Sequence, residues 1–319
     1  MKIAVTGVGG GVGQSILKSL KETDYQVIPL DADPLAAGLY YGMENGHVIP
    51  YARDEQFITQ LIEICKKEKI ALLFPGMDAE LMKLSVNREK FREVGTQVIV
   101  SRPEIIDIAD NKLLTYKKLT ALGINVPKTI DLTDFSSEEL SFPFIIKQKI
   151  GGARSNNVFV IENEVAFDNF LNIHNKSMDK FVAQEYLAGD EYTCGSVTLD
   201  GACNGVIVMR RILRNGDTYK SFSERNLVIE DFVKEICNKI EPFGACNVQL
   251  RLNNGVPFVF EINARCSGTT ASRSLCGFNE PKMIADKILK NIQPSFKIKE
   301  MTVLRYWEEI IVENSKIVK

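Results

Sequence analysis

The strongest constraint on the fold is a pair of apolar segments on either side of the turn sequence Asn253-Asn254-Gly255. Alternation of apolar and polar residues around such a turn predicts a β-hairpin over residues 244–265. Strict alternation assigns three apolar side chains to one face of each strand: Val248, Leu250 and Leu252 on the first, and Phe258, Phe260 and Ile262 on the second. The opposite face then carries the polar residues, and these are candidates for a functional site.

Three of these polar side chains are candidate metal ligands. Glu261 and Asn263 lie two residues apart, so their side chains share a face at a spacing of about 6.5–7 Å. Gln249 can reach the same place from the neighbouring strand. Three oxygen donors with a single charge suit Mg2+, a hard cation that fills its remaining positions with phosphates and water. The same residues also fit an ordinary polar face of a half-buried hairpin, and the pattern alone leaves both interpretations open.

Length and composition limit the class of protein. A chain of 319 residues is expected to form two or three domains. Its formal net charge of −2 predicts no attraction to nucleic acid or to an anionic membrane, and no apolar run approaches the roughly 20 residues that span a bilayer. Seven cysteines without a C-x-x-C pair argue against a disulfide framework or a zinc site. We therefore expect a cytoplasmic protein without nucleic-acid or membrane partners.

Short apolar runs alternate with helical patterns in the first hundred residues, which predicts a parallel sheet covered by helices. The expected strands are Ile3–Val5, Gln26–Leu30, Ala71–Phe74 and Gln97–Val100, and the expected helices are Gln14–Lys21 and Glu55–Lys67. Farther along, Asp110 is expected to cap a helix that ends at Leu122. Strands Phe144–Lys147 and Phe181–Tyr186, a helix near Pro281–Asn291 and a strand near Val303–Tyr306 follow. We predict domains over residues 1–108, 109–183 and 184–319.

A glycine-rich turn, Thr6–Gly13, follows the first strand. Gly7, Gly10 and Gly13 have the spacing of dinucleotide-binding reductases and epimerases, and Asp31 lies where a ribose-binding acid would be. Those enzymes use a Tyr-x-x-x-Lys pair as acid and base, and no tyrosine here has a lysine four residues on. An NAD(P)-dependent enzyme remains an alternative function. A bound anion or simple close packing of strand against helix explains the glycines equally well.

Four segments occur in the order seen in ATP-grasp ligases: Asp110-Asn111-Lys112, the strand Phe144–Lys147 before a Gly/Ser/Asn loop, the segment Gln184–Glu191, and Glu261–Arg265. The chain most resembles a single ATP-grasp unit of the carbamoyl phosphate synthase large subunit, over residues 1–295. The resemblance implies α/β and α+β structure: a Rossmann-like N-terminal (pre-ATP-grasp) domain followed by a two-lobed ATP-grasp fold.

The resemblance also implies roles for individual residues. Lysines and a mobile loop would hold the phosphates of ATP, and a hinge segment would hold its adenosine; these residues are Lys112, Lys147, Gly151, Gly152 and Ser155 for the phosphates, Gln184, Glu185 and Leu187 for adenine, and Glu191 for ribose. Gln249, Glu261 and Asn263 would bind Mg2+, with Mn2+ as an alternative. Arg265 and either Arg210 or Arg211, with Arg211 preferred, would stabilise the transferred phosphoryl group.

The implied reaction joins a small-molecule carboxylate to an amine, or to another nucleophile, through an acyl phosphate, with release of ADP and phosphate. Ligases of this kind are often homodimers. Carbamoyl phosphate synthesis itself fits less well, because that large subunit joins two such units. Two positions depart from the family pattern: Gly268 stands where a second arginine is common, and Asn247 where a basic residue is common. A catalytically silent ATP-binding subunit is therefore a further alternative.

Overall fold

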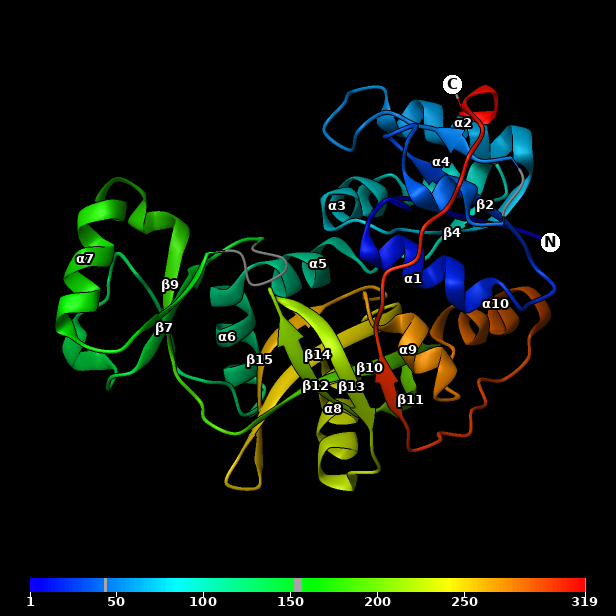
Figure 1. Ribbon diagram of the computed structural model, residues 1–319. Helices are drawn as coiled ribbons and strands as arrows, with labels where there is room; N and C mark the ends of the chain where they lie inside the picture. The colour runs from blue at the N-terminus through cyan, green and yellow to red at the C-terminus, as the bar shows by residue number, and fades with distance from the viewer. Residues whose placement is uncertain (43–44, 152–156, 319) are drawn as a thin grey trace.

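The computed structural model describes residues 1–42, 45–151 and 157–318. Three sheets organise this part of the chain, and Figure 1 shows their arrangement. A small sheet with one long helix, drawn in green, stands to one side of the other two. The first sheet, in blue, lies above the third, and helices near the C-terminus pack between them.

The first sheet is parallel and has the strand order β3-β2-β1-β4-β5. Its strands are β1 (Lys2–Val5), β2 (Gln26–Asp31), β3 (His47–Val48), β4 (Ile70–Phe74) and β5 (Gln97–Val98), and its helices are α1 (Gly11–Leu20), α2 (Phe57–Glu68), α3 (Asp78–Val86) and α4 (Arg88–Glu93). Ile3 packs with the apolar face of α1, whereas its neighbour Ala4 packs with α2. Successive strand residues point to opposite faces, so helices cover the sheet on both sides.

Two helices join the first sheet to the second, where the sequence predicted one. They are α5 (Pro103–Asp110) and α6 (Lys112–Ala121). Pro103 is accepted at the start of α5 because a first-turn N–H has no helical partner to lose. The expected cap at Asp110 is wrong. Asn111 has extended backbone and its side chain accepts hydrogen bonds from the N–H groups of Leu113 and Leu114, at 3.0 and 3.2 Å.

The second sheet is antiparallel, with the order β6-β9-β7-β8. It contains β6 (Thr129–Asp131), β7 (Phe144–Gln148), β8 (Val158–Ile161) and β9 (Phe181–Glu185), and α7 (Glu164–His174) packs on it. Phe144 from β7 meets Phe167 from α7 edge to face, with ring centroids 5.6 Å apart. This aromatic core is separate from the cores of the other two sheets, so the second sheet is a packing unit of its own.

The third sheet has the order β15-β14-β10-β12-β13-β16, and β11 pairs with β10. Its elements are β10 (Asp190–Leu199), β11 (Ala202–Ile207), β12 (Met209–Arg214), β13 (Asp217–Ser223), β14 (Gly244–Asn253), β15 (Val256–Asn263) and β16 (Thr302–Leu304), with helices α8 (Leu227–Ile240), α9 (Thr270–Leu275) and α10 (Glu280–Lys290). The apolar face of α8 packs against β10 and β14. Contacts of α1 with α9 and α10 hold the first sheet to the third.

The predicted hairpin is β14–β15, but strict alternation is wrong for its second strand. The register shifts between Gln249, which opposes Glu261, and Leu250, which opposes Val259. Phe260 is therefore the extra residue of a β-bulge, and the bulge reverses the phase of alternation. Val259 and Ile262 are the residues buried in the core. The polar set at Gln249 and Glu261 stays on one face because it lies beyond the bulge.

No helix in the described ranges is long and apolar enough to cross a membrane.

Candidate functional site

The three candidate metal ligands meet on one face of the hairpin. Glu261 Oε1 accepts hydrogen bonds from Gln249 Nε2 at 3.3 Å and from Asn263 Nδ2 at 3.0 Å. Within the described ranges no cluster of three or more histidines, cysteines or carboxylates could bind a metal, so an ion at this place would use the amide oxygens as well as Glu261. Oxygen donors with one negative charge fit Mg2+.

Arginines extend this set at both ends. Arg211 on β12 donates from Nη2 to Gln249 Oε1 at 2.6 Å, and Arg265 donates from Nη2 to Asn263 Oδ1 at 3.2 Å. The result is a continuous hydrogen-bonded series, which we call the polar series: Arg211, Gln249, Glu261, Asn263 and Arg265. Its charges are those of two guanidinium groups and one carboxylate. Each of its two arginines also pairs with a carboxylate outside the series, Arg211 with Glu191 and Arg265 with Asp78.

The structure distinguishes Arg211 from its neighbour Arg210. Adjacent strand residues point to opposite faces. Arg210 lies over the ring of Phe222, 4.5 Å from its centroid, and 3.8 Å from Glu224. Arg211 alone of the pair contacts the polar series.

Glu191, the candidate ribose ligand, is bound by two arginines. Its Oε1 accepts from Arg211 Nε and Nη2 at 2.9 and 2.6 Å, and its Oε2 accepts from Arg251 Nη2 at 2.7 Å. Arg251 also donates to Gly189 O at 3.1 Å. Sequence reasoning missed Arg251, although its position two residues after Gln249 on the same strand face was a usable signal.

Lys147 and Lys112 approach from the second sheet and α6. Lys147 is 7% exposed, and its Nζ donates to Phe260 O at 3.2 Å. Desolvation lowers the pKa of Lys147 to about 8, and attraction to Glu261 and Glu191 offsets only part of that effect. Lys112 Nζ donates to Asp110 O at 3.2 Å and to Gly151 O. Two cations with backbone carbonyl partners suit a polyanionic ligand.

The structure gives partners to the expected hinge residues. Gln184 donates from Nε2 to Thr129 Oγ1 at 2.8 Å, and Leu187 is 4% exposed. Glu185 N donates to Lys128 O at 2.9 Å, so this N–H is not free to bind adenine. Gly151 has φ +71° and its N donates to Asp110 Oδ1 at 3.1 Å. Gly152 and Ser155 lie outside the described residues.

Arg265 connects the polar series to the first sheet. Its Nε and Nη2 donate to the two carboxylate oxygens of Asp78, each at 2.6 Å, although the two residues are 187 positions apart. Desolvation raises the pKa of Asp78, but the charge and hydrogen bonds of Arg265 outweigh it, and the net effect is a lowered pKa. Asp78 begins α3 just beyond β4, at the carboxyl end of the first sheet. Ligands of parallel sheets bind at that end.

The glycine-rich turn is explained by packing. A Cβ on Gly13 would lie 2.4 Å from Gly7 O, and one on Gly76 would lie 2.0 Å from Thr6 O. The carboxylate of Asp31 accepts from Gly9 N at 2.6 Å and from Asp33 N at 2.9 Å. The residue expected to bind ribose thus holds the turn itself. This geometry favours the packing interpretation over an NAD(P) site.

Two buried acidic residues near the site were not anticipated. Glu80 is 4% exposed and accepts from Thr6 Oγ1 behind the glycine-rich turn, and desolvation raises its pKa to about 7. Glu280 forms a fully buried ion pair with Arg273, at 2.7 Å. Arg273 Nη2 also donates to Asn247 Oδ1 and, at 3.1 Å, to Thr193 Oγ1. A cationic group from α9 therefore reaches the place where the sequence has Asn247.

Two family models match the chain. A PylC-like N-terminal domain model matches residues 3–99, and an ATP-grasp domain model matches residues 109–269, which is half of the chain. The chain belongs to the ATP-grasp family. The predicted family and the predicted fold class are both confirmed.

Known proteins similar to this ATP-grasp chain include a curated relative and solved structures. The carbamoyl phosphate synthase large chain of Thermoanaerobacter pseudethanolicus is 25% identical over 234 residues, which are 66% of this chain and 21% of that one. The chain thus spans about a fifth of that relative's length.

Two solved structures share the fold. N5-carboxyaminoimidazole synthetase from Staphylococcus aureus, complexed with ADP, has a TM-score of 0.72 at 18% identity, over 95% of this chain and 79% of that chain. L-amino acid ligase from Bacillus licheniformis has a TM-score of 0.69 at 15% identity, over 91% and 74%.

Proposed function

We propose that this chain is an ATP-dependent ligase that joins a carboxylate to an amine, or to another nucleophile, through an acyl phosphate. The observation that carries the proposal is the polar series opposite a buried lysine: the Nζ of Lys147 donates to the backbone of Phe260, next to Glu261. Cations from two sheets therefore face a carboxylate and two amides. Such an arrangement suits a metal-bound triphosphate better than a neutral or cationic ligand.

The nucleotide would lie between the second and third sheets. Lys112 and Lys147 would offset the phosphate charge, and Gly151 would approach the phosphates by its backbone once its N–H leaves Asp110. Gln184, Glu185 and Leu187 would border adenine, with the carbonyl of Glu185 as the acceptor, since its N–H is used by Lys128. Glu191 would accept the ribose hydroxyls after exchange of its arginine partners.

The polar series supplies the remaining parts. Gln249, Glu261 and Asn263 would hold Mg2+, which screens the phosphate charge when it is bound. Arg211 and Arg265 end the series and already donate to its amide oxygens. They would donate to the phosphoryl oxygens as charge moves to them. Catalysis would then consist of positioning and charge stabilisation, without a nucleophilic side chain.

The proposed reaction has two displacements. A carboxylate oxygen attacks the γ-phosphorus and ADP leaves, which forms the acyl phosphate. The amine nitrogen then attacks the acyl carbon and phosphate leaves with that carboxylate oxygen, while the amine proton passes to solvent. The carboxylate would enter near the Arg265–Asp78 contact, where the carboxyl end of the first sheet meets the polar series. Both substrates would be small molecules.

One alternative keeps nucleotide binding without turnover. The side chain of Asn247 is occupied by Arg273 and Thr193, so it does not offer a free charge to a substrate. A silent ATP-binding subunit would release no ADP with any carboxylate and amine. An NAD(P)-dependent enzyme is disfavoured because the carboxylate of Asp31, which would bind the ribose, accepts hydrogen bonds from the backbone N–H groups of Gly9 and Asp33.

The test is a screen for ADP release from Mg-ATP across pairs of amino acids, dipeptides and hydroxy acids. With an active pair, a carboxylate labelled with 18O should transfer one label to inorganic phosphate. AMP as the stoichiometric product, or phosphate without label, would refute the acyl-phosphate route. No ADP release with any pair, together with tight Mg-ATP binding, would support the silent subunit.

A further inference from the structure

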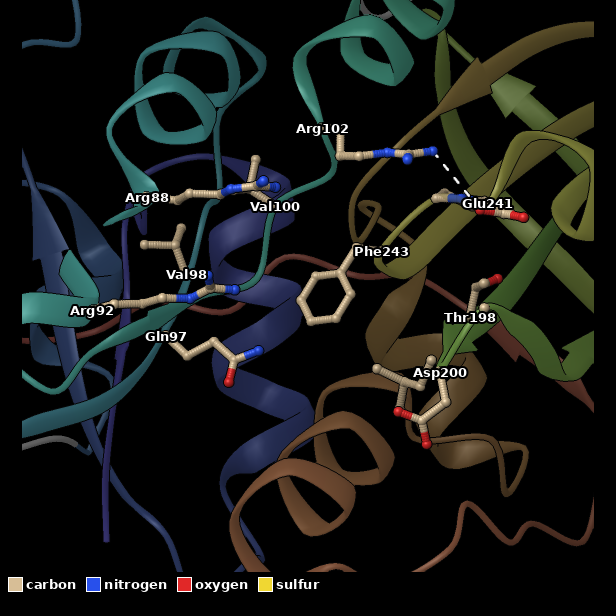
Figure 2. Close-up of a pocket in the computed structure, with 13 residues that line it drawn as sticks. Arg88, Arg92, Gln97, Val98, Val100, Arg102, Thr198, Asp200, Glu241 and Phe243 are labelled. Carbon is tan, nitrogen blue, oxygen red and sulfur yellow. Dashed lines mark ion pairs between the residues drawn. The ribbon is translucent and has the colours of Figure 1, made fainter. Parts of the chain in front are cut away.

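A pocket that none of the polar-series residues lines lies between the first and third sheets. Its volume is about 240 Å³. On one side are residues of α4, β5 and the chain that follows it, and on the other are the β10–β11 turn and the end of α8 (Figure 2). Thr198 in its wall is seven residues from Glu191 on β10, which corresponds to about 23 Å along the strand. The pocket is therefore distinct from the proposed nucleotide site.

Arginines dominate one wall of this pocket. Arg88 and Arg92 are four residues apart on α4, so their side chains extend on the same side of the helix. Both pair with Glu89, at 3.4 and 2.8 Å, and Glu89 does not line the pocket. One carboxylate shared by two guanidinium groups leaves positive charge at the wall. Figure 2 shows Arg88 and Arg92 extending from that wall toward Phe243.

Acidic residues near the pocket already have cationic partners. Glu241 lies 3.8 Å from Arg102, the pair joined by a dashed line in Figure 2, although Arg102 also pairs with Glu104 at 3.1 Å, and Asp200 lies 3.0 Å from Lys287. These contacts reduce the repulsion that an entering anion would meet. Among the described residues, the carboxylate that an anion at Arg88 and Arg92 would compete with is Glu89, whose side chain is 64% exposed. Exposed ion pairs of that kind are weak and exchange easily.

The centre of the pocket holds the apolar ring of Phe243, and the uncharged polar residues Gln97 and Thr198 line the pocket as well. The ring of Phe243 projects between the two walls, and its backbone N is fixed by Ser101 Oγ at 3.0 Å. Val98, Val100, Leu199 and Pro242 are the other apolar side chains of the lining. Thr198 is 2% exposed, and its Oγ1 has no hydrogen-bond partner among the described residues. A buried hydroxyl without a partner costs free energy, and a bound acceptor would remove that cost.

We propose that this pocket binds a small organic anion in which a phosphate or carboxylate group is attached to an apolar ring. The oxyanion would bind Arg88 and Arg92, the ring would pack against Phe243, and Thr198 Oγ1 would donate to an oxygen of the ligand. A volume of about 240 Å³ is below the range of about 300–1,000 Å³ that is usual for drug-sized ligands, so the ligand is smaller than ATP.

Isothermal titration of the full chain with phenyl phosphate tests the proposal. Saturating Mg-ADP keeps the probe from the nucleotide site. Benzoate is the corresponding probe with a carboxylate group. Comparison of its affinity with that of phenyl phosphate identifies which oxyanion the pocket prefers. Inorganic phosphate and benzyl alcohol each carry half of the proposed chemistry and should bind about tenfold more weakly or not at all. Failure of both phenyl phosphate and benzoate to bind, or equal binding of benzyl alcohol, would overturn the proposal.

Variants locate the binding. Arg92→Gln should lower the affinity for phenyl phosphate or benzoate, whichever binds more tightly, about tenfold or more, since it removes a charge-assisted hydrogen bond. Arg214→Gln is the matched control, because Arg214 stacks over Tyr219 outside the pocket and should leave affinity unchanged. Thr198→Val keeps the shape and removes the hydroxyl, and it should weaken binding several-fold. Unchanged affinity in Arg92→Gln would refute the pocket as the site, and unchanged affinity in Thr198→Val would refute the role of the hydroxyl.

Discussion

Arg251 holds the carboxylate of Glu191 at 2.7 Å, on the oxygen that is not bound by Arg211. Arg251 also donates to the backbone carbonyl of Gly189, in the connection between β9 and β10. A ribose at Glu191 would have to displace at least one of these arginines. Arg251 is the more exposed of the two, at 27% against 11%, and is the partner that leaves more easily.

Arg251→Met should therefore strengthen Mg-ATP binding. The pair is partly exposed, so its loss is worth about 0.5–1 kcal/mol, or roughly two- to fivefold in the dissociation constant. Titration calorimetry with ATP and with 3′-deoxy-ATP measures it, and the gain should be smaller for the deoxy compound. Arg214→Met is the control, on β12, which β10 separates from the strand of Arg251. Weaker ATP binding in Arg251→Met would show that Arg251 holds the nucleotide instead of competing with it.

Glu261→Gln should abolish metal-dependent nucleotide binding. The glutamine keeps the size of the side chain and one acceptor for Gln249 and Asn263, but it removes the charge from the proposed ligand set. Thermal shift should show stabilisation by Mg-ADP in the native chain and little in the variant, and turnover should fall roughly 100-fold or more. Glu224→Gln removes a carboxylate near Arg210, outside the polar series, and should change neither. Full Mg-ADP stabilisation in Glu261→Gln would show that Glu261 is an ordinary residue of the polar face of the hairpin and not a metal ligand.

ADP binding should weaken as the pH rises through about 8. Desolvation lowers the pKa of Lys147 from its ordinary value of 10.5 to about 8, so the free protein loses this charge above that pH. A bound phosphate favours the charged form, so binding above pH 8 should take up a proton. Calorimetry at pH 6.5–9.5 in buffers of different ionisation enthalpy measures both effects.

Variants at Lys147 identify the group that titrates. Lys147→Met should give a weaker and flat profile, whereas Lys147→Arg should keep the charge and remove the pH dependence. A native profile that is flat across pH 8 would contradict the assignment. The stability of the fold changes with pH in the opposite direction to ADP binding. Between pH 8 and 10.5 the unfolded chain holds a proton that folded Lys147 has released, so this residue makes folding more favourable as the pH rises.

Gly195→Ala should destabilise the fold, because a Cβ there would lie 2.4 Å from Glu280 Oε1 and 2.6 Å from Arg273 Nη1. Both partners are fully buried and cannot move aside, so a loss of about 1–3 kcal/mol is expected from overpacking. Gly268→Ala is the matched control, since nothing lies within 4 Å of a Cβ there and its change should be small. Urea unfolding of both variants measures the difference. Equal midpoints would mean that the side chains of Arg273 and Glu280 can shift to accommodate the added methyl group.

Much of the architecture followed from local patterns. The strands of the first sheet except β3, the hairpin of β14 and β15, and the order of the ATP-grasp segments were predicted, because each depends on residues near one another in the chain. The errors were local as well. Asn111 replaced Asp110 as a cap, and Phe260 was placed by strict alternation although a bulge contains it. The alternation of apolar and polar residues does not reveal a β-bulge unless a glycine occupies it.

The sequence by itself determined that a glutamate and two amides would share one face of a hairpin, because strand periodicity fixes which side chains share a face, whereas the two arginines were implied by the resemblance to ATP-grasp ligases. Only the tertiary structure decided which partners they have. It paired Arg265 with Asp78 across 187 residues, brought Arg211 instead of Arg210 to Gln249, and placed Arg251 against Glu191. Such contacts arise where separate sheets pack together. Their geometry depends on the filling of the cores between them, and no spacing within a single segment encodes it.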